Sequence, residues 1–210
     1  MLHGAWTLIA NLSAFQNAHP AKNQELEDFE PDGTWYSMVA VRGDLYAVEP
    51  NHQQMVKITT DGQVKLVADI SAYAGADHWI GPTALAYHGN FYFGNLGPFP
   101  QDIGSSKIYK ITPSGQINVD TGGFDMVLGL VFDNRARMYV LEMSHGNHAP
   151  APNTGRVTRI DPSGKTKPIA DGFLFPTGLA IGPDGHLYVS NFGFGGPPGA
   201  GSVWKIELTD

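Results

Sequence analysis

The sequence predicts an all-β protein, a β-propeller of four blades with four antiparallel strands in each blade. A tract of short strands recurs four times along the 210 residues. Each copy has the same order of apolar inner strand, tight turn and aromatic second strand. A repeat period in the forties that is built only from short strands is typical of propeller blades. The equivalent positions lie 46 to 49 residues apart, at Glu49, Asn95, Glu142 and Asn191.

Each predicted blade starts with a short apolar strand, such as Pro82–Tyr87 or Pro176–Ile181. A tight turn with Gly or Asn follows, because these residues accept positive φ at little cost. The third strand alternates, as in Arg156–Ile160, and a turn such as Pro162–Gly164 leads to the outer strand. The second strand carries an aromatic residue at a fixed place in every copy: Tyr46, Tyr92, Tyr139 and Tyr188.

The last repeat ends after its third strand, at Val203–Ile206, and the complementary piece is at the other end of the chain. Ala5–Phe15 matches the outer strand Gln63–Tyr73 position for position. We therefore predict that Ala5–Phe15 completes the last blade and closes the ring, which removes exposed sheet edges. The alternative is that the chain is part of a larger propeller. The expected single domain, residues 1–210, has blades at residues 34–73, 81–124, 126–173, and 175–210 together with 5–15.

Composition excludes several classes of protein. The net charge of −7 argues against a nucleic-acid groove, and the absence of cysteine excludes disulfides and thiolate metal sites. No apolar run is long enough to span a membrane, and Met1–Trp6 lacks the features of a signal peptide. The expected location is cytoplasmic, or extracellular if an export signal lies outside this chain. There is no nucleophile elbow, phosphate-binding loop or dinucleotide fingerprint, so serine-triad hydrolysis and nucleotide chemistry are not expected.

The turns within the blades are short, so the long connections share one face of the propeller, where function usually resides. The second strands end on that face with two carboxylates and two amides. Such oxygen donors suit Ca²⁺, and Mg²⁺ less well because it demands tighter octahedral geometry. The predicted metal ligands are Glu49, Asn95, Glu142 and Asn191. The alternative is that these side chains only hydrogen-bond the strand ends.

Three histidines follow the two carboxylates and could act as general bases near neutral pH: His52, His145 and His148. Hydroxyls at the starts of inner strands and aromatic residues in the long connections could contact a small ligand with an acyl or aromatic part. These candidate substrate residues are Ser37, Thr83, Thr177, Trp79, Phe99 and Phe192.

Several tracts resemble the scytonemin-cluster propeller family (ScyD/ScyE type) over nearly the whole chain. They are Asp28–Ser37, Tyr46–His52, Pro82–Tyr87, Tyr139–Glu142 and Phe175–Gly185. Members of that family have about six blades, so the chain resembles their C-terminal part. The resemblance implies the fold more than an activity.

More distantly, the chain resembles gluconolactonase/regucalcin and paraoxonase-type propellers, which hold Ca²⁺ on the axis and hydrolyse lactones or related esters. That group places Asn or Asp at the starts of inner strands, where this chain has Ser37, Thr83, Leu128 and Thr177. The departure puts the metal site of that group in doubt here. A third resemblance is to streptogramin-lyase propellers, whose second strands also end in Glu.

The leading functional hypothesis is a Ca²⁺-dependent lactonase acting on a small molecule such as an acyl-homoserine lactone, with His52 or His145 activating water. One alternative is a non-catalytic propeller that binds a ligand or protein. Another is a metal-dependent lyase acting on cyclic esters. The expected partners are a small-molecule substrate and further copies of this chain in a homo-oligomer, with neither nucleic acid nor membrane.

Overall fold

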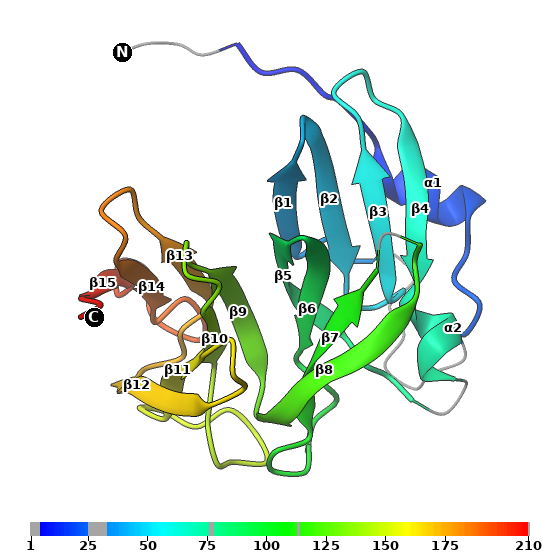
Figure 1. Ribbon diagram of the computed structural model, residues 1–210. Helices are drawn as coiled ribbons and strands as arrows, with labels where there is room; N and C mark the ends of the chain where they lie inside the picture. Colours follow the sequence, from blue (N-terminus) through cyan, green and yellow to red (C-terminus); the bar gives the residue numbers. More distant parts are fainter. Residues whose placement is uncertain (1–4, 25–32, 76–77, 113, 210) are drawn as a thin grey trace.

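Fifteen strands and two short helices are present in the computed structural model, which describes residues 5–24, 33–75, 78–112 and 114–209 (Figure 1). The strands form three four-stranded sheets and one three-stranded sheet, and within each sheet they are antiparallel and in chain order. We call these sheets blades 1 to 4. Neither helix has the length or apolarity needed to cross a bilayer within the described chain.

The helices are α1 (Leu12–Ala18) and α2 (Ile70–Ala74). Blades 1 and 2 contain β1 (Ser37–Val41), β2 (Asp44–Glu49), β3 (Gln54–Ile58), β4 (Val64–Asp69), β5 (Pro82–His88), β6 (Asn90–Asn95), β7 (Ser106–Ile111) and β8 (Ile117–Phe124). Blades 3 and 4 contain β9 (Val127–Phe132), β10 (Met138–Glu142), β11 (Gly155–Ile160), β12 (Thr166–Phe173), β13 (Gly178–Ile181), β14 (Leu187–Asn191) and β15 (Ser202–Ile206).

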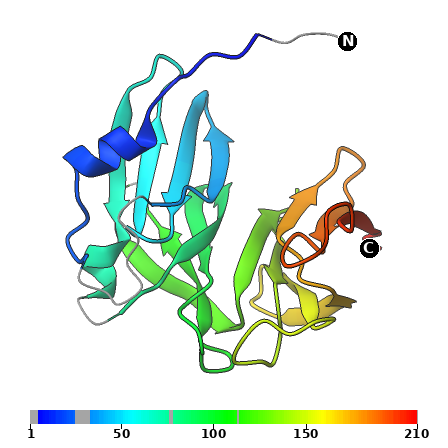
Figure 2. The ribbon, with the colours of Figure 1, turned by 180° about the vertical axis from the view of Figure 1, so that it is seen from behind.

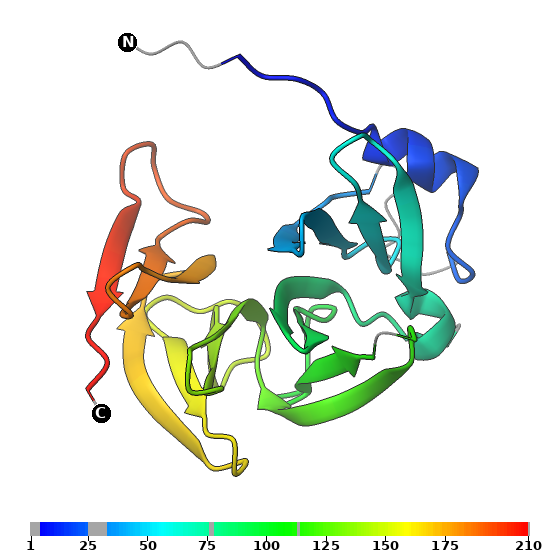
Figure 3. The same cartoon turned by 45° about the horizontal axis from the view of Figure 1, so that its top comes forward.

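The blades are arranged side by side around a common axis, with the first strand of each blade innermost (Figure 3). The inner strands contact one another in succession, β1 with β5, β5 with β9, and β9 with β13. No comparable contact joins β13 to β1 in the described residues, so the four blades form an open arc. The predicted all-β propeller of four blades is confirmed.

Tight turns reverse the chain between the first two strands of each blade. In blade 1 the two-residue turn Arg42–Gly43 has positive φ at both residues, 53° and 88°, and pairs Val41 with Asp44. This is the backbone that matches the twist of a β-hairpin, and Gly43 adopts it without steric cost. The turn brings the second strand back so that it ends on the face of the long connections.

Apolar clusters fill the spaces between consecutive blades. Val48 and Met55 of blade 1 pack with Phe93 of blade 2 in the first cluster. Equivalent clusters join blade 2 to blade 3 and blade 3 to blade 4. The aromatic residues of the second strands contribute to this packing, since the Tyr46 ring lies 4.4 Å from the Phe91 ring of the next blade. Packing between neighbours, rather than within one sheet, therefore holds the arc together.

The structure does not place residues 5–15 in the last blade, which corrects the predicted ring closure. Blade 4 has three strands, and Ala5–Asn11 belongs to none of the sheets. The described N-terminal segment instead lies beside blade 1 (Figure 2), where Leu12 and Phe15 pack on the apolar side chains of that blade. Its likeness to Gln63–Tyr73 is explained in part by a shared helix start. Asn11 caps α1 as Asp69 caps α2, each accepting a hydrogen bond from the amide three residues later.

Gly129 lies where β9 and β13 come close together, and it gives a test of this packing. A methyl group at Gly129 would lie 2.7 Å from Leu179 Cβ and 3.0 Å from Leu141 Cβ. We expect Gly129→Ala to lower the free energy of unfolding by about 1–3 kcal/mol, as overpacking of a core does. Urea unfolding measures the change. Gly122→Ala is the control, because its methyl group would meet the movable Lys107 side chain at 3.3 Å and the Ser106 carbonyl oxygen at an ordinary 3.9 Å, so a small effect is expected.

Candidate functional site

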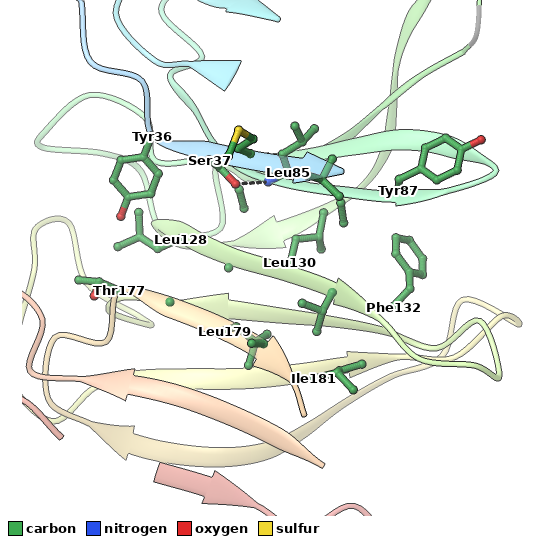
Figure 4. Close-up of a pocket in the computed structure, with 18 residues that line it drawn as sticks. Tyr36, Ser37, Leu85, Tyr87, Leu128, Leu130, Phe132, Thr177, Leu179 and Ile181 are labelled. Atoms are coloured by element: carbon green, nitrogen blue, oxygen red, sulfur yellow. Dashed lines mark hydrogen bonds between the residues drawn. The ribbon is translucent and has the colours of Figure 1, made fainter. Parts of the chain in front are cut away.

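A central cavity of about 500 Å³ lies between the four inner strands (Figure 4). Its walls are mostly apolar, with Leu85, Leu130 and Ile181 among the lining residues. Tyr36 and Thr177 lie together at the end nearer the starts of the inner strands, away from Tyr87 and Phe132 at the other end. The cavity is therefore an apolar channel with hydroxyl groups at the end that faces the long connections.

Glu49, the first predicted metal ligand, is fully buried and bonded to the backbone of its own blade. Its Oε1 accepts hydrogen bonds from the amides of Thr34 and Asn51, at 3.0 Å for Asn51. Its Oε2 accepts one from the amide of His52. Both carboxylate oxygens thus fix the connections before β1 and after β2.

The two amides take equivalent places in blades 2 and 4. Asn95 Oδ1 accepts from the Lys107 amide at 2.7 Å, and Asn191 Oδ1 accepts from the Leu174 amide at 2.8 Å. All these bonds stay within one blade or its adjoining connection. The axial metal site made from four second-strand ends therefore stays a prediction, and the described contacts commit its oxygens to other partners.

Glu142, the remaining one of the four predicted metal ligands, belongs to a different arrangement. Asp125, Glu142 and His145 form a compact cluster in blade 3, with ligand atoms within 4.8 Å of one another. His145 Nδ1 lies 2.9 Å from Glu142 Oε1 and 3.3 Å from Asp125 Oδ2. Asp125 lies in the link before β9 and His145 in the connection after β10, so the antiparallel pairing of these strands brings the two together.

Backbone amides hold both carboxylates in place. Asp125 accepts from the Gly104 amide and, at 2.7 Å, from the Gly146 amide. Glu142 Oε1 accepts from the Asp125 amide at 2.9 Å. Asp125 and Glu142 are 0% and 1% exposed, while the His145 side chain is 32% exposed. The imidazole is thus the part of the cluster that solvent or a ligand can reach.

The environment of Glu142 shifts its proton affinity. Burial raises the pKa of Glu142 above its ordinary value of 4.5, and the contact with His145 and the Asp125 amide oppose the rise. A buried carboxylate next to an imidazole favours a proton on Nδ1. The ring nitrogen Nε2, which neither carboxylate contacts, is then available as a base.

The cluster could also hold a divalent cation, because it offers two carboxylates and one imidazole. The imidazole nitrogen and the small number of oxygens do not fit Ca²⁺, which takes six to eight oxygen ligands. Zn²⁺ and Mn²⁺ accept such mixed donors. The residues present therefore fit a transition metal better than the calcium expected from the sequence.

The other two candidate bases differ in exposure, since His52 is buried and His148 is exposed. His52 is 5% exposed, and its amide is bonded to Glu49. His148 Nδ1 lies 2.7 Å from the carbonyl oxygen of Gln101, and the Gln101 amide donates to the His148 carbonyl at 2.9 Å. These contacts join two long connections, so His148 has a clear role in positioning the backbone.

Of the six candidate substrate residues, Ser37 and Thr177 line the cavity. The other four do not line it. Thr83 is 1% exposed and donates to carbonyl oxygens of Val127 and Gly94. The Trp79 indole donates to the Pro50 carbonyl at 2.9 Å.

Phe99 and Phe192 lie in the long connections between the second and third strands of blades 2 and 4. Phe99 is 45% exposed, and the Phe192 ring lies 6.5 Å from that of Phe175. Neither ring lines the central cavity.

Sequence reasoning missed Asp125 and Tyr36. Asp125 lies in the short link before β9, and Tyr36 directly precedes β1, so both are just outside the repeated strands. Asp125 follows Phe124 at the point where Leu174 follows Phe173 in the next repeat, so an acid there is specific to one blade. That single departure from the repeat is the signal that could have found it.

Leu128 connects the cluster with the cavity. It packs with Met126 and Met143, the residues that follow Asp125 and Glu142, and it also lines the cavity. None of the three cluster residues lines the cavity, and Leu128 with the two methionines connects the cluster to the cavity wall. Two buried carboxylates, an accessible imidazole and an apolar channel make an arrangement suited to proton transfer on a small ligand.

Solved structures of several propellers are similar to this chain, although no family model and no curated protein matches its sequence. A gluconolactonase from Xanthomonas campestris is 18% identical with a TM-score of 0.57, over 80% of this chain and 55% of that one. A catalytically inactive His→Ala variant of virginiamycin B lyase from Staphylococcus aureus, with quinupristin, is 18% identical with a TM-score of 0.54, over 85% and 58%.

A nidogen/laminin complex gives a TM-score of 0.58 at 13% identity, over 77% of this chain and 58% of that one. The chain thus spans little more than half the length of these relatives. Similarity at this level of identity shows the propeller fold. It includes gluconolactonase-like propellers, as the distant resemblance predicted, whereas the scytonemin-cluster resemblance stays a prediction.

The buried contacts of Glu49 predict a structural role that a metal ligand would not have. We expect Glu49→Ala to lower the free energy of unfolding by more than about 2 kcal/mol, because buried amides lose their acceptors. Glu49→Gln keeps one acceptor oxygen and should cost less. Urea unfolding with and without a chelator measures both variants. A loss of stability in Glu49→Ala that chelation of the wild type reproduces would instead identify a metal ligand.

The raised pKa of Glu142 predicts a change of stability with pH. Because its pKa is raised, the Glu142 carboxyl binds its proton more tightly in the folded protein than in the unfolded chain. At neutral pH the carboxylate is ionised, and its burial penalty lowers the free energy of unfolding. This penalty disappears as the pH falls through the folded-state pKa toward the ordinary value of 4.5. The unfolding free energy of the wild type should therefore rise relative to that of Glu142→Gln as the pH falls. Urea titrations across pH measure this difference, and Glu207→Gln, at an exposed site, should show no such trend.

Proposed function

We propose that this protein opens cyclic esters by hydrolysis, with His145 as the general base. The observation that supports it most is the imidazole held through Nδ1 by two buried carboxylates, in a cluster that Leu128 connects to the wall of the central channel. A general base needs a fixed tautomer and access to water. His145 has a buried partner for Nδ1 and a partly exposed ring.

The proposed step uses this chain's own groups. His145 Nε2 takes a proton from a water molecule while the water oxygen attacks the lactone carbonyl carbon. The ring C–O bond then breaks, and the departing ring oxygen takes the proton back from Nε2, which yields a hydroxy acid. Asp125 and Glu142 stabilise the imidazolium formed in between, because their negative charge lies within about 3 Å of Nδ1.

The channel suggests the substrate class. Its volume of about 500 Å³ is in the range of small-molecule sites, and leucine side chains wall its middle. The Tyr36 and Thr177 hydroxyls, at one end of the channel, would face the polar lactone. An acyl-homoserine lactone would place its acyl chain in the apolar part and its lactone ring at the hydroxyl end, and we propose it as the substrate.

Calcium has no step in this proposal, because the cluster does not fit it. A Zn²⁺ or Mn²⁺ ion held by Asp125, Glu142 and His145 would polarise the lactone carbonyl as a Lewis acid. In that case the positioning of the substrate by the channel would be unchanged. The names of two similar structures, a gluconolactonase and a lyase whose His→Ala variant is inactive, support chemistry on cyclic esters.

Elimination by a lyase is the second candidate, since the same base could remove a carbon-bound proton next to the ester. Hydrolysis in ¹⁸O-labelled water distinguishes the two reactions. The hydrolytic product carries one labelled oxygen in its carboxylate, whereas the elimination product carries none.

We expect His145→Ala to lower kcat for an acyl-homoserine lactone by about 10²–10⁴-fold, the range for loss of a general base. Lactone opening followed by pH-stat or product chromatography measures this. His148→Gln is the matched control in the same connection and should retain most of the activity.

Equal turnover in His145→Ala and the wild type would contradict the proposed mechanism. Absence of lactone opening in the wild type, with binding of the lactone retained, would favour a non-catalytic binding propeller. Loss of turnover on chelation, restored by Zn²⁺ or Mn²⁺, would assign the cluster to a metal.

A further inference from the structure

The last strand of blade 4 is exposed where its counterparts are buried. Val203 of β15 is 73% exposed, whereas the equivalent residues Met55, Ile108 and Val157 are each 0% exposed. Trp204 is 56% exposed, and its equivalent in blade 2, Tyr109, is 6% exposed. In the other blades an outer strand pairs with this third strand. Blade 4 therefore presents an apolar strand with unpaired backbone along one edge.

The N-terminal segment, at the opposite end of the arc, has the sequence of an outer strand. Residues 5–10 match β4 in sequence, and in the described structure they pair with no strand. Trp6 is 92% exposed and Leu8 is 75% exposed. Two exposed apolar side chains with alternating spacing form the surface of a strand that has no sheet to join.

Helix α1, which follows residues 5–10, already lies where a helix lies after an outer strand. Leu12 of α1 packs on blade 1, as Ile70 of α2, its sequence equivalent, packs in the cluster between blades 1 and 2. The N-terminal segment is thus seated against blade 1 as the end of a preceding blade.

We propose that two copies of this chain exchange these strands, residues 5–10 of each copy forming the outer strand of blade 4 in the other. The pairing of β3 with β4 gives the register, because Lys57 pairs with Lys65 and Val56 with Leu66. The equivalent pairs across copies are Lys205 with Thr7, and Trp204 with Leu8. Strand addition of this kind satisfies the open edge and covers Val203 and Trp204.

A second copy is the occupant that the geometry favours over the chain's own N-terminus. Blade 4 does not come round to blade 1 in the described residues, and Ala10 is held in the apolar cluster of blade 1. Ala5 is five positions before that anchor, a length of chain that spans at most about 18 Å when extended. Reciprocal exchange between two copies is closed by a two-fold axis and leaves neither edge open.

Engineered disulfides test the register, and the absence of cysteine makes the background clean. In the Thr7→Cys, Lys205→Cys double variant, directly opposed residues come close enough for a disulfide. The expected result is a covalent dimer on a non-reducing gel. Thr7→Cys with Lys57→Cys is the matched control, because β3 already has its outer strand and Lys57 forms an exposed pair with Asp44 as Lys205 does with Asp184.

Light scattering on the unmodified chain should give about twice 22.6 kDa. Leu8→Pro should return the mass to that of a monomer, because proline removes a backbone donor and Leu8 has little contact to lose. A disulfide formed within one chain would overturn the proposal in favour of self-closure. A monomeric wild type without a crosslink, or a ladder of larger oligomers, would overturn it as well.

Discussion

Apolar packing between neighbouring blades is the interaction on which the rest of this structure depends. Each sheet is narrow, and its faces are covered mainly by the neighbouring blades, with α1 and the segment before it also covering part of blade 1. Each fully buried valine, leucine or phenylalanine contributes roughly 1.5–3 kcal/mol. Because the chain has four blades and three inter-blade clusters, its two ends are less covered than its middle. Met38 of β1 is 60% exposed, while Ala84 at the equivalent place in β5 is 2% exposed.

Polar side chains at the ends of the second strands form the next level of organisation. They accept hydrogen bonds from backbone amides of adjoining strands, links and connections, and so hold these segments in place. In three blades this is their whole described role. In blade 3 the acceptor Glu142 also contacts His145, so a structural contact used throughout the repeat becomes part of a candidate site.

Much of the fold could be predicted from the sequence, because a repeat of 46 to 49 residues fixes the number and order of strands. The turn residues and the positions of the strand ends could be predicted from the same repeat. Ring closure could not be predicted, since the sequence of residues 5–15 specifies an outer strand and a helix without specifying which sheet receives them. The angle between blades depends on side-chain packing, and the strand pattern does not contain it.

The candidate site was predicted in part. Glu142 and His145 were found because they share a strand end and the loop after it. Asp125 was missed because repeat-based reasoning looks for equivalent positions, and only one repeat has an acid there. Glu49 and the two amides were grouped by symmetry as metal ligands, which stays a prediction, and the structure shows each bonded within its own blade or the adjoining link. Pseudo-symmetry places backbones at equivalent points, but the local partners decide where each side chain points.

Assembly and the site are connected through the central channel. Its walls are the inner strands, and the two at the ends of the arc, β1 and β13, each have one side without a neighbouring blade. A second copy that completes blade 4 would bring further inner strands toward that side and enclose the channel more fully. Water is then excluded from the apolar part, and the interaction between His145 and its two carboxylates strengthens as the local dielectric constant falls. The strand exchange and the proposed proton transfer would then reinforce each other, because both depend on how completely blades surround the axis.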